Sequence, residues 1–190
     1  MKFILFVEGE TERKALPVFL QKWLEAGLSM RVGIDAVKFN GWQELVKGSP
    51  KKALMHLNGP KKGDIIAVIA LLDLYGPTFY PNDKKTAKAR YDWAKEDIEK
   101  EVGHQKFRQF FAVHKTEAWL LSEPNLFPAE VKKALSAKIQ HPEQVNFDEP
   151  PAKLLQRLYK EKTKRIYKKT IHGSELFNQL DVGLACGKCP

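Results

Sequence analysis

Cysteines, long apolar runs and internal repeats are scarce or lacking in this chain of 190 residues. The two cysteines, Cys186 and Cys189, lie close together near the C-terminus, so they cannot link distant parts of a fold. The longest apolar run, residues 65–72, is much shorter than the ~20 residues that cross a bilayer. The apolar residues 3–7 are too few for a secretory signal peptide. We therefore expect a cytoplasmic protein with one sizeable domain.

Two common ligand-binding motifs are also missing. The chain has no glycine-rich loop that ends in Gly-Lys-Ser or Gly-Lys-Thr, so we expect that it does not hydrolyse ATP by itself. Cys186 and Cys189 form a lone Cys-x-x-Cys pair, without two further soft ligands at the spacing of a zinc site. The role of this pair stays open.

Positive charge, by contrast, is abundant. Lys and Arg number 32 against 23 Asp and Glu, which gives a formal net charge of +9, and the pI is near 9.4. An excess of this size favours a polyanionic partner, most simply nucleic acid. Hydrophobic residues make up 43% of the chain, which is enough to form a folded core.

Alternating apolar patterns predict an α/β fold. We expect strands at residues 3–7, 34–39, 65–73 and 107–113, with amphipathic helices between them at residues 12–26, 42–56 and 84–102. Thr11 is the expected N-cap of the first helix, and Pro17 should kink this helix or mark its start. The second helix should be interrupted around residues 48–50. This alternation predicts about four mostly parallel strands with helices on both faces of the sheet.

Acidic side chains follow three of the predicted strands. They are Glu8, Glu12, Asp73 and Glu117. Because the carboxyl ends of parallel strands meet at one edge of a sheet, Glu8 and Asp73 should converge. Carboxylates packed together repel one another unless cations hold them, so the pattern predicts a site for one or two Mg²⁺ or Mn²⁺ ions. Alternatively, Glu8 and Asp73 are solvated turn residues, and Glu12 only complements the helix dipole.

Four motifs together carry a resemblance to a known family. They are Val7-Glu8-Gly9-x-Thr11-Glu12, Asp73-Leu74-Tyr75-Gly76, His114-x-x-Glu117-Ala118-Trp119-Leu120-Leu121, and Tyr167-Lys168-Lys169 with His172-Gly173. The first two resemble the Toprim domain of topoisomerases, primases and OLD-family nucleases. The whole set resembles a bacterial family catalogued as domain of unknown function 4276, which is regarded as Toprim-like.

The resemblance implies a Mg²⁺- or Mn²⁺-dependent nuclease or nuclease subunit that hydrolyses phosphodiester bonds in DNA, in genome maintenance or phage defence. It implies that Glu8 is a general base or metal ligand and that Glu12, Asp73 and Glu117 are metal ligands. Lys168 or Lys169 would steady the scissile phosphate. In OLD proteins an ATPase domain accompanies the Toprim domain, so the resemblance also implies a separately encoded ATPase partner.

One position departs from the Toprim pattern. The second aspartate of the Toprim Asp-x-Asp motif is replaced by Tyr75, and a phenol with a pKa near ~10 is a poor ligand for a hard metal ion. The competing interpretation is therefore a degenerate Toprim module that binds nucleic acid or regulates an ATPase without cutting. His114 is either a ligand or base, or a structural histidine at a strand end.

The C-terminal part is expected to be a helical, basic extension at residues 126–190, after a core with the acidic site at residues 1–125. Its basic residues are Lys160, Lys162, Lys164, Arg165, Lys168 and Lys169. Such a stretch is typical of a groove for a nucleic-acid backbone, and equally of the solvated face of a helix. Another basic cluster, at residues 84–90, lies at the start of a predicted helix, where it opposes the helix dipole. It either serves a ligand or is a plain solvated face.

Overall fold

A computed structural model of the chain describes residues 1–113, 115–135, 137–143 and 149–189. These residues contain a four-stranded parallel sheet in the order β2-β1-β3-β4. Its strands are β1 (Lys2–Val7), β2 (Gly33–Lys38), β3 (Ile65–Asp73) and β4 (Phe107–Ala112). The predicted α/β class and the four parallel strands are confirmed.

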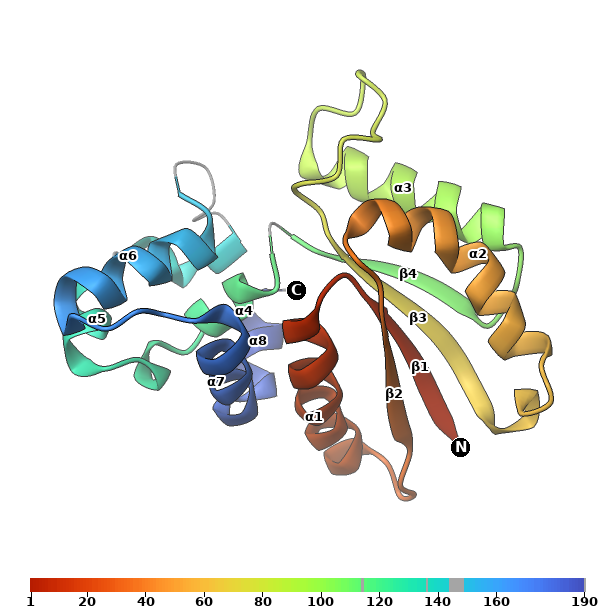
Figure 1. The fold of residues 1–190 in the computed structure, drawn as a ribbon, viewed down its shortest axis with the longest axis horizontal. Coiled ribbons are helices and arrows are strands. Elements are labelled where there is room, and N and C mark those ends of the chain that lie inside the picture. Colours follow the sequence, from red (N-terminus) through yellow and green to blue (C-terminus); the bar gives the residue numbers. More distant parts are fainter. Residues whose placement is uncertain (114, 136, 144–148, 190) are drawn as a thin grey trace. The chain divides into compact units, whose positions relative to one another are not determined.

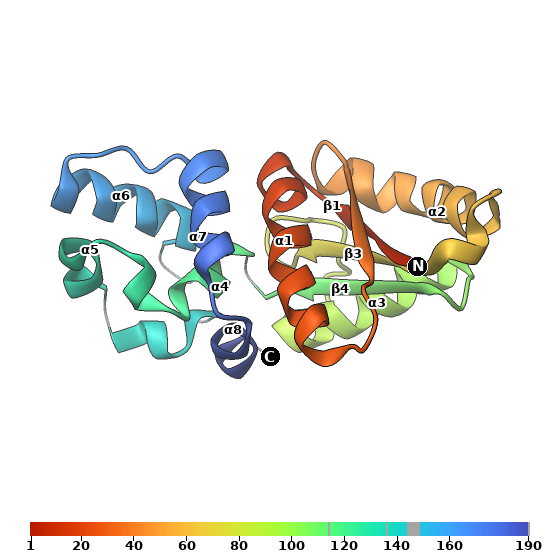
Figure 2. The same ribbon diagram turned by 90° about the horizontal axis from the view of Figure 1, so that it is seen from below.

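Helices cover both faces of this sheet, as Figures 1 and 2 show. Helix α1 (Glu10–Gly27) packs on one face against β1 and β2, whereas α2 (Trp42–Asn58) and α3 (Ala87–Val102) pack on the other face. The central strands are apolar because both of their faces are covered. Phe6 of β1, for example, is fully buried and meets the ring of Phe39 edge-on, with 5.2 Å between the ring centroids.

Two helix starts differ from the sequence prediction. Helix α1 begins at Glu10 with Gly9 as its N-cap, so Thr11 lies inside the first turn, where it is buried, and Pro17 lies within the helix. Helix α3 begins at Ala87, because the Thr86 hydroxyl accepts a hydrogen bond from the backbone N–H of Ala89 at 3.1 Å and caps the helix there.

The predicted interruption of α2 is wrong, since the helix continues through Pro50. A proline cannot donate a hydrogen bond to the carbonyl four residues earlier, which here is that of Val46. The hydroxyl of the buried Ser49 donates to this carbonyl instead, at 3.3 Å. Gly48 leaves room for a core ring, because a Cβ at this position would lie 3.1 Å from Cε1 of Phe39.

The chain divides into two compact units, Met1–Ala112 and Val113–Pro190. The first unit contains the sheet, and the second is helical, as predicted for the C-terminal extension. Its helices are α4 (Glu117–Leu121), α5 (Ala129–Ala134), α6 (Pro151–Thr163), α7 (Ser174–Gln179) and α8 (Val182–Lys188). The division lies before the expected position after residue 125, so Glu117 belongs to the helical unit. In the described part of the chain, no helix is long and apolar enough to cross a membrane.

The Ser49 contact leads to a test of how α2 tolerates its proline. Ser49→Ala should lower the free energy of unfolding by about 1 kcal/mol, because it leaves the Val46 carbonyl without its donor. In a Pro50→Ala background the same change should cost much less, since the backbone N–H of alanine can serve that carbonyl. Urea denaturation of the four proteins measures both effects, and equal costs in the two backgrounds would contradict this role of Ser49.

Candidate functional site

Glu8 and Asp73 meet at the carboxyl edge of the sheet. Strands β1 and β3 are parallel neighbours, with Phe6 beside Ala70, so the residues that follow β1 lie next to the end of β3. The backbone N–H of Asp73 donates a hydrogen bond of 2.8 Å to Oε1 of Glu8, and both residues are half-buried. The two residues are therefore neighbours at this edge of the sheet, and the hydrogen bond orients the Glu8 carboxylate.

The turn that presents Glu8 is held by the chain segment after β2. The backbone N–H of Phe39 donates to the Val7 carbonyl at 2.9 Å, and that of Gly41 donates to the Glu8 carbonyl at 3.1 Å. Gly41 has a φ of 96°, a conformation that glycine adopts readily. Two backbone hydrogen bonds from the segment after β2 therefore hold the backbone at the end of β1, from which the Glu8 side chain projects.

Glu12 lies in the first turn of α1 and is buried. Its carboxylate folds back over Gly9, because a Cβ at Gly9 would lie only 2.8 Å from Oε2 of Glu12. The glycine of the Glu-Gly motif is therefore needed for space, since its φ of −143° is open to any residue. A side chain at this position would have to displace the Glu12 carboxylate.

Two tyrosines follow Asp73 in the loop between β3 and α3. Tyr75, at the place of the second Toprim aspartate, is half-buried. The Tyr80 hydroxyl donates to the carbonyl of Leu74 at 2.8 Å. Burial raises the pKa of Tyr80, Arg90 lowers it, and the carboxylates of Glu8 and Asp73 raise it again, so the phenol is neutral and acts as a donor. No sequence pattern had indicated Tyr80, because it lies in an irregular loop.

Glu117 is buried in the second unit, where its side chain is 1% exposed. Its Oε1 lies 2.7 Å from Nζ of Lys169, whose side chain is 35% exposed. Among the described residues, no hydrogen-bond donor reaches Oε2 of Glu117. The second unit thus contains an acid and a lysine from two of the motifs, and it brings them into contact.

An aromatic cluster in the same unit includes Tyr167, whose phenol is influenced by both charges of the ion pair. Tyr167 is buried, and its ring stacks on that of His172 and tilts toward that of Tyr159, at centroid distances of 5.7 and 5.3 Å. Burial raises the pKa of the Tyr167 phenol, and the charge of Glu117 raises it further. Nδ1 of His172 accepts a hydrogen bond of 2.8 Å from the backbone N–H of Lys168, at the start of a π-helical turn, Lys169–Gly173. Such turns are frequent at functional sites.

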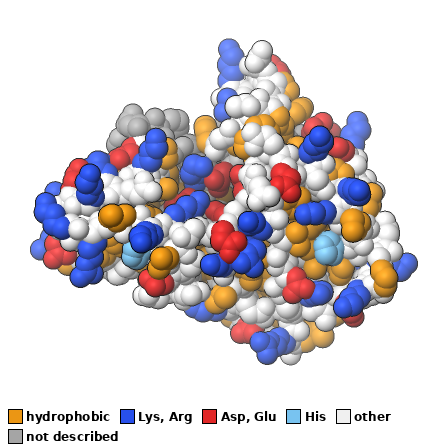
Figure 3. Space-filling model, viewed as in Figure 1, with side chains coloured by type: hydrophobic (Ala, Val, Ile, Leu, Met, Phe, Trp, Pro, Cys, Tyr) orange, Lys and Arg blue, Asp and Glu red, His pale blue; other side chains and the backbone are white. Residues whose placement is uncertain are grey.

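The predicted basic residues lie on different elements. Lys160 and Lys162 are in the last turn of α6, Lys164 follows it with a φ of 58°, and Arg165 and Lys168 are in the next segment. These five side chains are exposed, whereas Lys169 turns to Glu117. Figure 3 shows Lys and Arg side chains gathered over the end of α6.

The first unit offers donor groups that fit a hard divalent cation, although they do not form a complete set of ligands. Glu8 and Asp73 contribute carboxylate oxygens at one edge, and Glu12 is held beside Gly9. Within the described ranges, no three His, Cys, Asp or Glu side chains are gathered closely enough to hold a metal ion. His114 lies outside the described residues.

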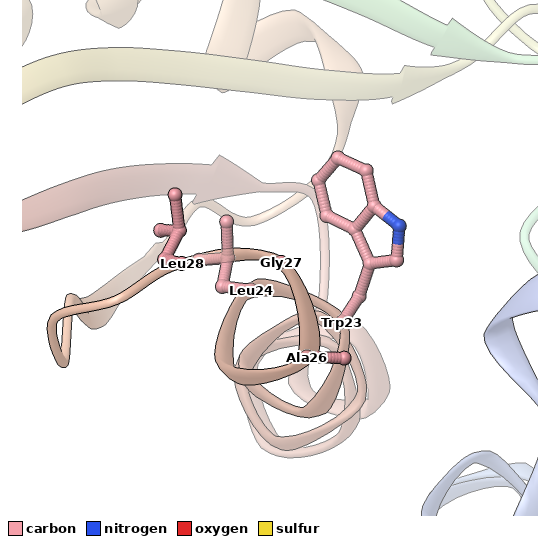
Figure 4. Close-up of a pocket in the computed structure, with 5 residues that line it drawn as sticks. All are labelled: Trp23, Leu24, Ala26, Gly27 and Leu28. Atoms are coloured by element: carbon pink, nitrogen blue, oxygen red, sulfur yellow. The ribbon is translucent and has the colours of Figure 1, made fainter.

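A pocket of about 410 Å³ lies elsewhere, at the C-terminal end of α1. Figure 4 shows its lining, which consists of Trp23, Leu24, Ala26, Gly27 and Leu28. An 18-residue helix is about 27 Å long, so the pocket lies far from Glu12 in the first turn. It has no ionisable side chain, and we assign no chemistry to it.

A family model matches residues 7–190, and its description is domain of unknown function (DUF4276). The chain belongs to this family. The match covers both compact units, so the acidic edge of the sheet and the Glu117–Lys169 pair lie within one family domain. None of the curated proteins matches the chain.

Among solved structures, the chain is similar to C-terminal regions of OLD proteins. The region from Burkholderia pseudomallei is 16% identical with a TM-score of 0.48, and the alignment covers 98% of this chain and 92% of that one. The region from Xanthomonas campestris pv. campestris is 19% identical with a TM-score of 0.48, and the alignment covers 99% of this chain and 88% of that one.

The buried ion pair predicts an asymmetry between two adjacent lysines. Lys169→Met should lower the free energy of unfolding by about 2 kcal/mol, because it leaves the Glu117 carboxylate buried without its cation. This is less than for a fully buried pair, since solvent reaches part of Lys169. Lys168→Met, the matched control at an exposed site, should cost less than about 0.5 kcal/mol.

A double variant, Glu117→Gln with Lys169→Met, should recover part of the loss, since no buried charge remains. Urea denaturation gives all three values. Equal stability of the two single lysine variants would show that the ion pair does not hold the second unit together.

Proposed function

We propose that this protein hydrolyses phosphodiester bonds in DNA with the help of a divalent metal ion. The observation that carries the proposal is the hydrogen bond between the Asp73 backbone and the Glu8 carboxylate, because it joins two acids from separate strands at the ligand-binding edge of a parallel sheet. The resemblance of the surrounding motifs to Toprim nucleases supports the same chemistry.

Glu8, Glu12 and Asp73 are the proposed ligands in the first unit for Mg²⁺ or Mn²⁺. A bound ion would polarise the phosphate and lower the pKa of the attacking water. Glu8 is also the proposed general base, since its orientation is set by the Asp73 backbone rather than by a mobile contact. The contribution of Glu117 as a further ligand stays a prediction.

Of the two lysines that could steady the phosphate, Lys169 is the better candidate. Its ammonium group is positioned by the buried Glu117 carboxylate, whereas Lys168 is exposed. Pre-positioned charge stabilises a transition state more effectively than charge on a freely rotating side chain. The five exposed cations near the end of α6, together with the net charge of +9, suit the DNA backbone. A separately encoded ATPase is the proposed protein partner.

Plasmid nicking with Mg²⁺, Mn²⁺ or EDTA tests the proposal. Glu8→Gln and Asp73→Asn should each lower the rate of metal-dependent cleavage by about 10²-fold or more, because each removes a charge but keeps the size of the side chain. Asp64→Asn is the matched control, since Asp64 is an exposed acid just before the amino end of the same strand, β3. It should cleave at the wild-type rate.

Cleavage that is equally fast in all variants would place the activity elsewhere or in a contaminant. If the wild type does not cleave, the assay is repeated with the separately encoded ATPase that is proposed as its partner. Continued absence of cleavage in that assay would overturn the proposal.

A non-catalytic module is the second candidate, and two observations favour it. Tyr75 replaces a motif aspartate, and the described acids do not gather in a group of three around one point. Such a module would bind DNA equally well in EDTA and in Mg²⁺, and Glu8→Gln would not change its affinity.

The cations near the end of α6 should contribute to DNA affinity under both candidates. Replacing Lys160, Lys162, Lys164, Arg165 and Lys168 by glutamine should flatten the dependence of log K on log [KCl], since each lost phosphate contact removes about 0.9 from the slope on duplex DNA. Fluorescence anisotropy in EDTA measures the slope. An unchanged slope would show that this stretch is only a solvated surface.

A further inference from the structure

Arg90 lies between two aromatic rings beside the acidic edge. Its guanidinium carbon is 5.7 Å from the ring centroid of Tyr75 and 5.3 Å from that of Tyr80, which are distances typical of cation–π contacts. Its Nε donates a hydrogen bond of 2.9 Å to the carbonyl of Lys84. The two rings and this carbonyl together restrict the position of the guanidinium group.

The two terminal nitrogens of Arg90 are available to bind an anionic ligand. In the described part of the chain, Arg90 forms no ion pair, and its side-chain hydrogen bond is the one from Nε. The two terminal nitrogens of a guanidinium suit bidentate binding of a phosphate. Arg90 also lies in the first turn of α3, where a cation opposes the helix dipole, so its position lowers the stability of the helix rather than raising it.

Tyr80 connects Arg90 to the acids. Its hydroxyl donates a hydrogen bond to the carbonyl of Leu74, the residue after Asp73, and its ring lies against Arg90. Burial raises the pKa of this phenol, the charge of Arg90 lowers it, and the charges of Glu8 and Asp73 raise it. Figure 1 shows the loop between β3 and α3 that carries both tyrosines, and Figure 3 shows basic side chains on it.

We infer that Arg90 is a binding site for a phosphate of the nucleic acid, next to Glu8 and Asp73. The inference rests on the proposed function and names a further residue of the same site. Where the Toprim motif has a second aspartate, this chain has Tyr75, whose ring supports a permanent cation. In this proposal the site has one carboxylate fewer than the Toprim motif, and the guanidinium group of Arg90 lies nearby. Arg90 binds a phosphate of the nucleic acid next to Glu8 and Asp73.

DNA binding in EDTA tests the phosphate site without any cleavage. Arg90→Gln should weaken binding of a fluorescein-labelled duplex and lower the slope of log K against log [KCl] by about 0.9, the value for one phosphate contact. Arg31→Gln is the matched control, because Arg31 precedes β2 at the amino ends of the strands, with a side chain that is 87% exposed. It should keep the wild-type slope.

A second measurement uses the wild type alone, so it does not depend on how the variants fold. Phenylglyoxal modifies accessible arginines, and peptide mapping by mass spectrometry reports the extent at each site. Bound duplex should slow the modification of Arg90 several-fold and leave that of Arg31 unchanged. A wild-type slope for Arg90→Gln, or equal modification of Arg90 with and without DNA, would overturn the inference.

These results are independent of the nicking assay. If the wild type cleaves but DNA does not protect Arg90, the inference fails and the proposed nuclease stands. If DNA protects Arg90 but no metal supports cleavage, the proposed hydrolysis fails and the phosphate site stands, as part of a binding module.

Discussion

The parallel pairing of β1 with β3 is the constraint on which the candidate site depends. This register places the residue after β1 beside the last residue of β3, and the Asp73 backbone then donates to the Glu8 carboxylate. A shift of one residue would turn one of the two acids toward the opposite face of the sheet. The buried apolar side chains of β1 and β3 strongly favour this register, because any other would misplace them. The relative position of Glu8 and Asp73 therefore depends on the packing of these two strands.

Next to these acids, the loop after β3 carries Tyr75 where the Toprim motif has its second aspartate, and the Tyr75 ring lies against Arg90. Tyr75 and Tyr80 form a cradle for Arg90, and the Tyr80 hydroxyl ties the cradle to the end of the strand. Both tyrosines present their rings to the guanidinium group of Arg90. The position at which the sequence departs from the Toprim motif thus lies beside a positive charge.

The second unit contains an ion pair whose carboxylate is buried and whose cation is partly exposed. Glu117 and Lys169 come from motifs that lie far apart in the sequence, and the Glu117 carboxylate is buried. A buried carboxylate of this kind is costly without its cation. Its cation, Lys169, is the first residue of the π-helical turn Lys169–Gly173.

The sequence by itself determined the α/β class, the four strands and the acids at their ends, because continuous apolar runs and strand-end carboxylates are local patterns. It could not show that α2 runs through Pro50, since the compensating Ser49 hydroxyl matters only in the folded helix. Glu117 was expected in the core and lies in the second unit. Only the tertiary structure paired Glu117 with Lys169 and placed Arg90 between two tyrosine rings, because such contacts depend on side-chain packing in three dimensions, which no spacing along the chain encodes.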